Sequence, residues 1–427
     1  MLKFILGINT LLQKVKGFRD IFGEDTAYWH KVEAKLQKFF KSCGFSEFRL
    51  PVLEKTAVFK RGIGETTDIV EKEMFTFIDS EEQVSLRPEG TAALMRAYIE
   101  NNLHNPPGIK KYYYLGNMFR RERPQKGRFR QFTQIGVEVL ECDAPLLDAE
   151  IIGMLYKTSE ILGFNNYVSM EINSIGCPDC RPKYKEDLIK YFDKEKDKLC
   201  DDCKRRLETN PLRILDCKVE SCKNIAKDAP SILNYLCDTC SSHFESVKEY
   251  LTMMNIPFKI NERMVRGLDY YIRTAFELVT DKLGAASAVG AGGRYDGLVK
   301  SLGGKDTAGI GFAIGLDRVV ELLKEVNPVD YHYTDVFILV FDKENLPYTF
   351  NLVENLRSAG YVAEYDYNIA SMKSQMKKAD KSKARYAVIL GSNEVKENKA
   401  SVKDLISGEQ SLIELDNVFE YLKNKLI

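Results

Sequence analysis

The sequence predicts a protein of several domains: an α+β domain with antiparallel strands, a small cysteine-rich module and a C-terminal α/β domain. Two strand-like runs that flank a basic loop, at residues 111–118 and 129–140, indicate the first domain. Eight cysteines between residues 177 and 240 indicate the module, and alternating strand and helix patterns after residue 335 indicate the last domain.

The composition describes a globular protein and excludes several classes. With 427 residues, 44% hydrophobic and 29% charged, the chain is long enough for roughly two to four domains. Its 62 basic and 62 acidic residues argue against a protein that coats nucleic acid indiscriminately, because such binding depends on the phosphates neutralised. Apolar runs are far shorter than a membrane span. The first twelve residues lack a small-residue cleavage site, so we expect a cytoplasmic protein with no membrane association.

The histidines are too scattered to suggest a metal site or a catalytic triad. The sequence has four: His30, His104, His243 and His332. We therefore expect the chemistry to depend on Arg, Glu, Gln and Tyr side chains.

A helix and an extended segment open the first domain. Apolar residues recur at helical spacing between Glu24 and Cys43 and end at Gly44. They are Tyr28, Val32, Leu36, Phe39 and Phe40. The following segment Phe45–Leu53, which contains Pro51, is typical of an extended strand. The pattern alone fits an ordinary surface helix packed on a sheet.

The basic loop between Arg120 and Arg130 is the most informative feature of the sequence. It holds six basic side chains in eleven positions, interrupted by Pro124 and Gly127. Guanidinium groups bind phosphate through paired N–H donors, so the loop suits a nucleotide or an RNA end, although a solvated charged hairpin has the same composition. On the next strand Gln134 and Glu138 are an even number of residues apart, which places them on one face and indicates a site.

The cysteines occur in four pairs at or near metal-ligand spacing. They are Cys177 and Cys180, Cys200 and Cys203, Cys217 and Cys222, and Cys237 and Cys240. Eight thiolates would form two four-cysteine zinc sites, whereas unpaired thiols are the alternative and disulfides are disfavoured in a cytosol. The sequence leaves the pairing open, and a site at residues 200–222 nested inside one at 177–240 is the simplest topology. Helices are expected at Lys183–Leu199 and Ser241–Met253.

The remaining segments alternate between strands and helices. Strands are expected at Met264–Val279 and Ala285–Gly293, then a helix from Leu316 and a linker at Asn327–Thr334. The last hundred residues predict a small sheet covered on both faces. Its expected elements are the strands Val336–Phe341, Val362–Tyr365 and Tyr386–Leu390 and the helices Leu346–Gly360 and Ser371–Lys381.

Three long stretches resemble the signature motifs of histidyl-tRNA synthetases, which are class II aminoacyl-tRNA synthetases. They are FRRERPQKGRFRQFTQIGVE at Phe119–Glu138, RGLDYYIRTAFE at Arg266–Glu277 and AGGRYDGLVKSLGG at Ala291–Gly304. The resemblance runs from about Lys16 to the C-terminus. It implies a class II catalytic domain with an antiparallel sheet over residues 1–176 and 259–326, an inserted module at 177–258 and an α/β anticodon-binding domain at 335–427. It also implies a homodimer whose interface includes the helix at 24–43 and the Pro51 strand.

The resemblance implies a role for individual residues. Arg120 and Arg266 correspond to the catalytic cations, and the alternative for Arg266 is an ion pair with Asp269 or Glu277. The residues expected to bind ATP are Arg120, Glu122, Phe132 and Arg318. Those expected to bind histidine are Glu89, Gly90, Thr91, Arg120, Gln134, Glu138, Arg266, Tyr270, Tyr271 and Tyr295. Arg123, Gln125, Lys126 and Arg128 are expected to bind tRNA. The chain departs from the family pattern at Asp317, where Glu is common, and at Thr133, where His is common.

The function implied is an ATP-dependent ligase that activates histidine as histidyl-adenylate and transfers it to the 3′ end of tRNA(His), with Mg²⁺ accompanying ATP. One alternative is a non-catalytic synthetase paralogue that acts as a regulatory subunit in histidine biosynthesis. Such paralogues lack the C-terminal module and erode these motifs, whereas this sequence has both. Another is an RNA-binding regulatory module, for which loss of the ATP arginines is expected, and Arg120 and Arg318 are present.

Overall fold

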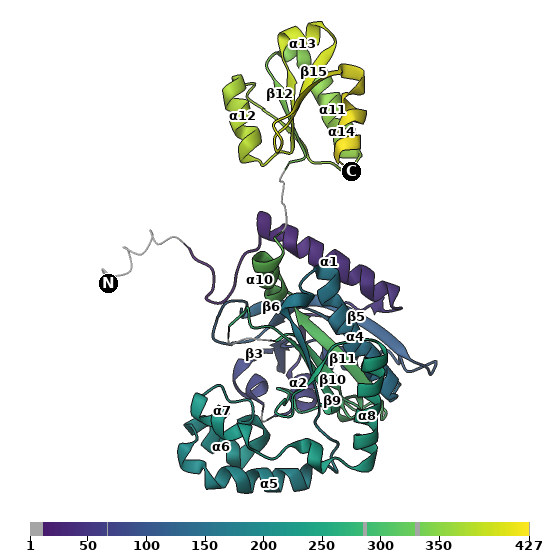
Figure 1. The fold of residues 1–427 in the computed structure, drawn as a ribbon, viewed down its shortest axis with the longest axis vertical. Helices are drawn as coiled ribbons and strands as arrows, with labels where there is room; N and C mark the ends of the chain where they lie inside the picture. The colour runs from purple at the N-terminus through teal and green to yellow at the C-terminus, as the bar shows by residue number, and fades with distance from the viewer. Residues whose placement is uncertain (1–11, 66, 285–287, 329–333, 427) are drawn as a thin grey trace, which may run out of the picture. The chain divides into compact units, whose positions relative to one another are not determined.

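The computed structural model describes residues 12–65, 67–284, 288–328 and 334–426. The chain divides into two compact units, one containing Tyr28–Pro328 and the other containing residues 334–426 (Figure 1). Each unit is described by itself. Among the described residues, no helix is both long and apolar enough to cross a membrane.

An eight-stranded sheet forms the centre of the first unit, in the order β1-β5-β6-β11-β10-β9-β7-β8. The strands are β1 (Ser46–Glu47), β5 (Lys110–Phe119), β6 (Gln131–Leu140), β7 (Ser169–Ser174), β8 (Lys259–Ile260), β9 (Ile272–Val279), β10 (Ala288–Arg294) and β11 (Gly309–Gly315). Neighbouring strands from β5 to β7 are antiparallel, as predicted, whereas β1 and β8 join the edges in parallel and make the sheet mixed.

One face of this sheet is covered by helices. Phe40 of α1 (Glu24–Ser42) lies 6.1 Å from the ring of Tyr113 and 6.0 Å from that of Phe312. On β6, Val137 pairs with both of these strand residues, so the odd-numbered residues of β6 face the helices. The predicted apolar stripe of α1 is therefore buried against its own sheet, and the even-numbered residues of β6 face the other side.

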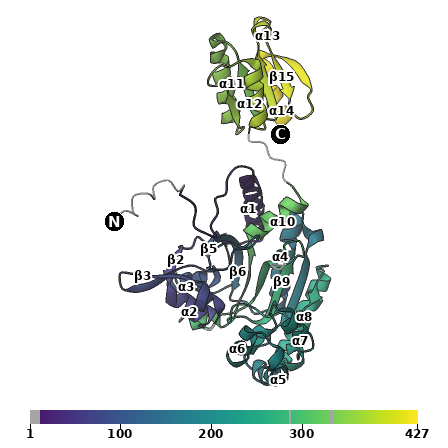
Figure 2. The ribbon, with the colours of Figure 1, turned by 90° about the vertical axis from the view of Figure 1, so that its left-hand side faces the viewer.

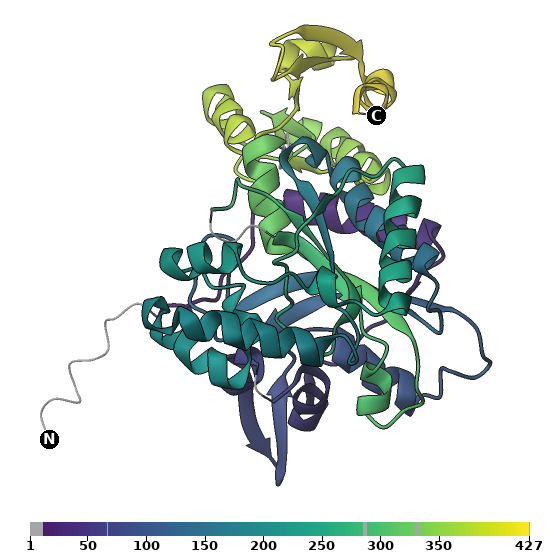
Figure 3. The same ribbon diagram turned by 60° about the horizontal axis from the view of Figure 1, so that its bottom comes forward.

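The opposite side carries a smaller sheet and its helices. The sheet has the order β2-β4-β3, and a hairpin of β3 and β4 projects from the unit (Figures 2 and 3). The elements are β2 (Leu53–Lys55), α2 (Thr56–Ile63), a π-helix (Ile69–Glu73), β3 (Phe75–Asp79), β4 (Glu82–Leu86) and α3 (Thr91–Glu100). Helix α3 begins directly after the RPEG segment, at Thr91.

Between β7 and β8 the chain forms a helical module with its own small core (Figure 1). Its helices are α5 (Arg181–Lys194), α6 (Asp201–Thr209), α7 (Glu220–Lys227) and α8 (Asp238–Met253). Tyr184, Phe192 and Leu207 belong to that core, whereas α8 also packs against α4 (Pro145–Leu162). Both predicted helices are present, although α5 ends earlier, at Lys194.

One predicted strand is wrong over half its length. The strand expected at Met264–Val279 begins only at Ile272, because the preceding residues form a loop. The Asp269 N–H donates to Ile63 O at 3.0 Å, outside any ladder, and Arg273 has a φ of 50°. The strand expected at 285–293 is β10 from Ala288 onward, and residues 285–287 lie outside the described residues. The expected helix from Leu316 is α10 (Leu316–Val326).

The second unit contains a five-stranded sheet in the order β13-β12-β14-β15-β16. Its elements are β12 (Val336–Val340), α11 (Leu346–Ser358), β13 (Ala363–Tyr365), α12 (Met372–Lys381), β14 (Tyr386–Leu390), α13 (Ser392–Lys396), β15 (Lys399–Asp404), β16 (Gln410–Glu414) and α14 (Val418–Leu426). Val336 and Ile338 pack with α11 and α14, whereas Phe337 and Leu339 pack with α12. The predicted sheet covered on both faces is confirmed, and the elements after β14 extend it. The predicted linker lies mostly outside the described residues.

Candidate active site

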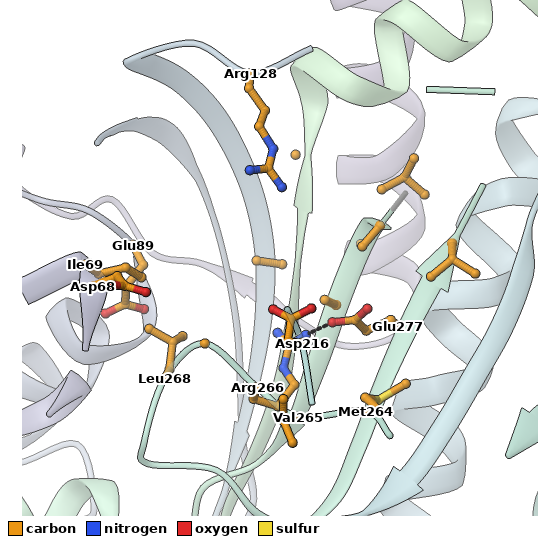
Figure 4. A pocket seen from close by; sticks show the side chains of 18 of the residues that line it. Asp68, Ile69, Glu89, Arg128, Asp216, Met264, Val265, Arg266, Leu268 and Glu277 are labelled. Atoms are coloured by element: carbon orange, nitrogen blue, oxygen red, sulfur yellow. Dashed lines mark hydrogen bonds and ion pairs between the residues drawn. The ribbon is translucent and has the colours of Figure 1, made fainter. Parts of the chain in front are cut away.

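A cavity of about 1260 Å³ lies on the side of the large sheet opposite α1. It is bounded by β6, the start of α3, the loop before β9 and residues of the inserted module (Figure 4). Thirteen of the residues predicted to bind histidine, ATP or tRNA line it: Glu89, Thr91, Arg120, Glu122, Arg128, Phe132, Gln134, Glu138, Arg266, Tyr270, Tyr271, Tyr295 and Arg318. The structure therefore brings the predicted histidine and ATP residues together.

Glu138 is buried within the sheet at one end of the cavity. Its carboxyl accepts hydrogen bonds from Thr91 Oγ1 at 2.6 Å and from the Tyr295 hydroxyl at 2.5 Å. Burial raises the pKa of Glu138 to about 8, against the effect of these two hydrogen bonds. The paired residue on β11 is Gly311, where a Cβ would lie 2.0 Å from Glu138 Oε2. Only glycine leaves room for this carboxyl, and the sequence analysis did not identify it.

Glu89 has a structural role beside the predicted one. Its carboxylate accepts from the N–H groups of Thr91 at 2.6 Å and Ala92 at 2.9 Å, and so caps the first turn of α3. Burial raises the pKa of Glu89, and these backbone bonds oppose that shift. Gly90 does not line the cavity; a Cβ there would lie 2.4 Å from the ring of Tyr114.

Besides Nε of Arg128 and Nε of Arg266, two neutral polar groups of the cavity are buried without a hydrogen-bond partner among the described residues. They are the Tyr114 hydroxyl and Gln134 Oε1. Tyr114 was missed from the sequence, although β5 pairs it with Gly136 on the face that carries Gln134 and Glu138. Such groups favour a ligand that supplies the missing hydrogen bonds.

Arg266 approaches Glu138's end of the cavity from the loop before β9. It forms an ion pair with Glu277, as the alternative interpretation predicted (Figure 4). Its guanidinium lies 4.9 Å from the ring of Tyr271. Burial alone would lower the pKa of Arg266, but Tyr271 and Glu277 outweigh it and raise the pKa. Arg266 Nε is buried without a partner in the described chain, so the ion pair leaves part of the guanidinium unsatisfied.

Positive charge gathers at the other end of the cavity. The guanidinium of Arg120 lies 5.4 Å from the ring of Phe132, and Arg128 Nη1 donates to Glu122 at 3.1 Å. Arg318 donates to Ala288 O. Burial lowers the pKa of Arg318 to about 10, and the neighbouring Arg128 adds to that shift. A cluster of partly desolvated guanidinium groups favours a polyanion such as a nucleotide.

Backbone hydrogen bonds connect both ends of the basic loop to the rest of the domain. The Arg121 N–H donates to Glu73 O at 2.7 Å, and the Arg130 N–H donates to Gly17 O at 2.8 Å. Arg123, Gln125 and Lys126 are exposed at the tip, whereas Arg128 points into the cavity (Figure 4). Of the four residues predicted to bind tRNA, three are therefore exposed at the tip of the loop, and Arg128 lines the cavity.

The two departures from the family pattern contact each other. The Thr133 N–H donates to Asp317 Oδ2 at 2.8 Å, and Arg19 donates to Asp317 Oδ1 at 2.7 Å. Asp317 thereby joins the N-terminal segment, β6 and the helix that carries Arg318.

The eight cysteines form two groups of four. Cys177, Cys180, Cys237 and Cys240 form one, Cys200, Cys203, Cys217 and Cys222 form the other, and the sulfur atoms within each lie within 4.8 Å of one another. Sulfur–sulfur distances of 3.6, 3.9 and 3.8 Å match the edge of about 3.8 Å in a tetrahedral zinc site with Zn–S bonds of about 2.3 Å. The nested pairing is thus the observed one, and both groups could bind zinc.

Comparisons with known families cover most of the chain. The family described as "Histidyl-tRNA synthetase" matches residues 17–319, and the family described as "Anticodon binding domain" matches residues 335–425.

Individual proteins match over nearly their full length. A histidine–tRNA ligase of Syntrophotalea carbinolica is 47% identical over 96% of this chain and 98% of its own, and one of Geobacter metallireducens is 48% identical over 95% and 98%. The structure of apo Staphylococcus aureus histidyl-tRNA synthetase has a TM-score of 0.78 at 34% identity and covers 97% of this chain and 100% of its own. An ATP phosphoribosyltransferase regulatory subunit/histidyl-tRNA synthetase from Bacillus halodurans C shares the fold, with a TM-score of 0.64 at 18% identity, and covers 90% and 100%.

Proposed function

The chain belongs to the histidyl-tRNA synthetase family of class II aminoacyl-tRNA synthetases, and from that premise we propose a role for each part of its cavity. It is a histidine–tRNA ligase, an ATP-dependent enzyme that activates histidine as histidyl-adenylate and transfers the histidyl group to the 3′ end of tRNA(His). The predicted alternative, a regulatory paralogue, is not supported, because relatives at 44–48% identity are ligases and the anticodon-binding domain is present.

Histidine binds at the Glu138 end of the cavity. The Glu138 carboxyl, held by Thr91 and Tyr295, accepts a hydrogen bond from the imidazole ring. The unpartnered Gln134 Oε1 and the Tyr114 hydroxyl supply further polar contacts, and Tyr270 and Tyr271 form the walls. Glu89 and Thr91, at the start of α3 beside Gly90, bind the α-ammonium group. An amino acid without a ring N–H leaves these buried groups unpaired, which is the basis of selectivity.

ATP binds at the other end, so that Arg120 and Arg266 flank the reacting groups. Arg318 and Phe132 enclose the adenine ring, and Glu122 and Arg128 lie beside the phosphates. The histidine carboxylate attacks the α-phosphorus, pyrophosphate leaves, and the two arginines stabilise the charge that develops on the phosphate oxygens. Mg²⁺ accompanies ATP as part of the substrate.

The tRNA acceptor end meets the exposed tip of the basic loop. Arg123, Gln125 and Lys126 are solvent-exposed beside the cavity, and Arg128 reaches inward, so it serves the incoming ribose as well as the nucleotide. The unit after residue 334 holds the anticodon.

Each cysteine group binds one structural zinc ion. The geometry supports this, because the four sulfur atoms of each group lie close enough together to occupy the corners of a tetrahedron around one ion. The backbone N–H of Cys200 also donates to Cys222 Sγ, and that of Cys237 donates to Cys180 Sγ, both at 3.2 Å. Bound zinc cross-links segments that are far apart in the chain, and elemental analysis of the purified protein measures it.

Three further assignments follow from the family. The catalytic domain spans 1–176 and 259–326, the inserted module 177–258 and the anticodon-binding domain 335–427. The protein is cytoplasmic. It forms a homodimer through the segment around Pro51, where Val52 is 42% exposed and Leu53 is 45% exposed. Sedimentation equilibrium at micromolar concentration tests the dimer, and a fully active monomer would exclude it.

The observation that carries the assignment is the buried Glu138 carboxyl among unpartnered polar groups, and pyrophosphate exchange tests it. The protein should exchange labelled pyrophosphate into ATP with histidine alone among the amino acids. Glu138→Gln should raise the KM for histidine at least about tenfold, because an amide cannot ionise, whereas the carboxyl can become a charged acceptor when the ring N–H binds to it, and should leave the KM for ATP unchanged. Glu150→Gln is the control, because Glu150 is a half-buried carboxylate on α4 that pairs with Lys111 and does not line the cavity. Equal exchange with a second amino acid would refute the assignment.

A further inference from the structure

The loop Arg266–Tyr271 carries Tyr270 and Tyr271 of the proposed histidine pocket and the proposed catalytic residue Arg266, and two arginines of the inserted module bind the ends of this loop. Arg213 Nη1 donates to the main-chain oxygen of Arg266 at 3.3 Å. Arg181 Nη2 donates to the main-chain oxygen of Tyr271. Both arginines bind the backbone of the loop, so they fix its path without occupying the place of its side chains.

The carboxyl of Asp269, in the middle of the loop, lies within the electrostatic influence of the same two arginines. Burial raises the pKa of Asp269, and the charges of Arg213 and Arg181 oppose that shift, so both guanidinium groups act on this carboxyl. The Asp269 N–H also donates to Ile63 O at 3.0 Å. At the neighbouring Gly64 a Cβ would lie 2.6 Å from Asp269 Oδ2, so the loop is packed closely against the end of α2.

Each arginine is close in sequence to the cysteines of one group. Arg181 directly follows Cys180 of the first group and also donates to Ile175 O at 3.3 Å. Arg213 lies in the short helix Pro211–Ile214, between Cys203 and Cys217 of the second group. From the same segment Arg206 donates to Asp68 at 3.2 Å.

Arg181 is the first residue of α5, which has 14 residues, and Arg213 is in a helix of 4 residues between α6, with 9 residues, and α7, with 8. Isolated helices shorter than about 12–15 residues are only marginally stable in water. A metal ion bound by four thiolates contributes folding free energy to such a module. The positions of Arg181 and Arg213 should therefore depend on the metal.

We propose that the inserted module is a metal-dependent clamp on the loop Arg266–Tyr271. A soft divalent cation such as zinc in each cysteine group fixes the segments that carry Arg181 and Arg213, and these two positioning residues hold the loop in the geometry that binds histidine. The proposal rests on the proposed function of the cavity.

Substitution of the two arginines tests the clamp. Arg181→Met and Arg213→Met should keep the metal content of the wild type, by elemental analysis, and raise the KM for histidine in pyrophosphate exchange roughly tenfold or more, with little change in the KM for ATP. Arg181→Lys and Arg213→Lys keep a donor and should restore part of the affinity. Arg205→Met is the control, because Arg205 is on α6 with its side chain 51% exposed and pairs only with Asp202 among the described residues. Kinetic constants equal to those of Arg205→Met would overturn the arginine part of the proposal.

Hydrogen exchange tests the metal part without using activity. In the full-length protein, removal of metal by a chelator should accelerate exchange of the amides at 266–271, the Asp269 amide included, to the rate seen in the metal-loaded Arg181→Met/Arg213→Met protein. Amides of β12, in the other unit, are the internal reference. Unchanged protection after metal removal, or a metal-free purified protein with the loop equally protected, would overturn it. Failure of the proposed function gives a different result, namely no histidine-dependent exchange in the wild type.

Discussion

At the scale of single residues, the cavity contains polar groups whose partners are absent from the described chain. The Tyr114 hydroxyl, Gln134 Oε1 and Arg266 Nε are all buried without a hydrogen bond. Leaving such a group unsatisfied costs about 1–3 kcal/mol, and a bound substrate recovers that free energy. Histidine together with ATP should therefore stabilise the protein against unfolding through the mass-action effect of binding, and the recovered free energy contributes to the affinity that sets the size of this effect.

Glu138 should make stability depend on pH. An unfolded glutamate has a pKa of about 4.3, whereas burial raises the pKa of Glu138 to about 8. Between these values the folded protein binds a proton that the unfolded chain has released, so the free energy of unfolding falls as pH rises to about 8. Glu138→Gln cannot titrate and should lose less stability across that window, by on the order of a few kcal/mol. Urea unfolding of both proteins at pH 5 and pH 8 measures the difference, and parallel losses would contradict the shift.

Arg266 should be needed for turnover more than for binding of histidine. Arg266→Lys keeps the charge but loses the planar fork, so we expect kcat for pyrophosphate exchange to fall by roughly two orders of magnitude and the KM for histidine to change little. Arg205→Lys, on the module surface, is the matched control. Near-normal turnover would show that Arg266 serves only its ion pair with Glu277.

At the scale of secondary structure, the sequence predicts site residues best where they alternate along a single strand and so share one face of the sheet. The alternation on β6 placed Phe132, Gln134 and Glu138 together, and the structure has them in one cavity. The segment 264–271 was wrongly predicted as strand, because its Tyr and Leu residues satisfy a strand pattern while its backbone binds Ile63, Arg181 and Arg213.

Some features had no sequence signal. The Glu89 cap and the bonds from Arg181 and Arg213 to main-chain oxygens depend on tertiary proximity, which spacing does not encode. Gly311 could have been found only from the β6–β11 register. The strands β15 and β16 contain many polar residues, and β16 is exposed on one side, so they lack the apolar run that identified β12 and β14.

The exposed tip of the basic loop should act on tRNA and not on activation. Lys126→Ala removes an exposed charge at the loop tip, so tRNA affinity should fall and the dependence of log K on log[salt] should decrease by about one unit. Pyrophosphate exchange, which needs no tRNA, serves as the internal control. An unchanged salt dependence would place this part of the loop outside the tRNA interface.

At the scale of the whole molecule, the two units should divide the reaction between them. The first contains the whole cavity, and the second has its own core around Val336, Leu352 and Val388. Deleting residues 335–427 should leave pyrophosphate exchange largely intact and lower aminoacylation of tRNA sharply. Thermal unfolding of the truncated protein verifies that the first unit still folds. If the truncated protein charges tRNA as well as the full chain, the second unit does not read the anticodon.

The nested arrangement also determines which cysteine group is complete first during synthesis of the chain. Cys200 and Cys222 are 22 residues apart, whereas Cys177 and Cys237 are 60 apart, and the outer group needs cysteines that leave the ribosome last. The inner group can therefore load its metal while the outer group still lacks half of its ligands, and β9, which pairs with β7, emerges only after both groups are complete. The module is thus expected to assemble from the inside outward on the nascent chain, before the catalytic sheet can close. Metal retained by ribosome-bound chains long enough to expose Cys222, but not Cys237, outside the ribosome would reveal that intermediate, and chains of that length without metal would exclude it.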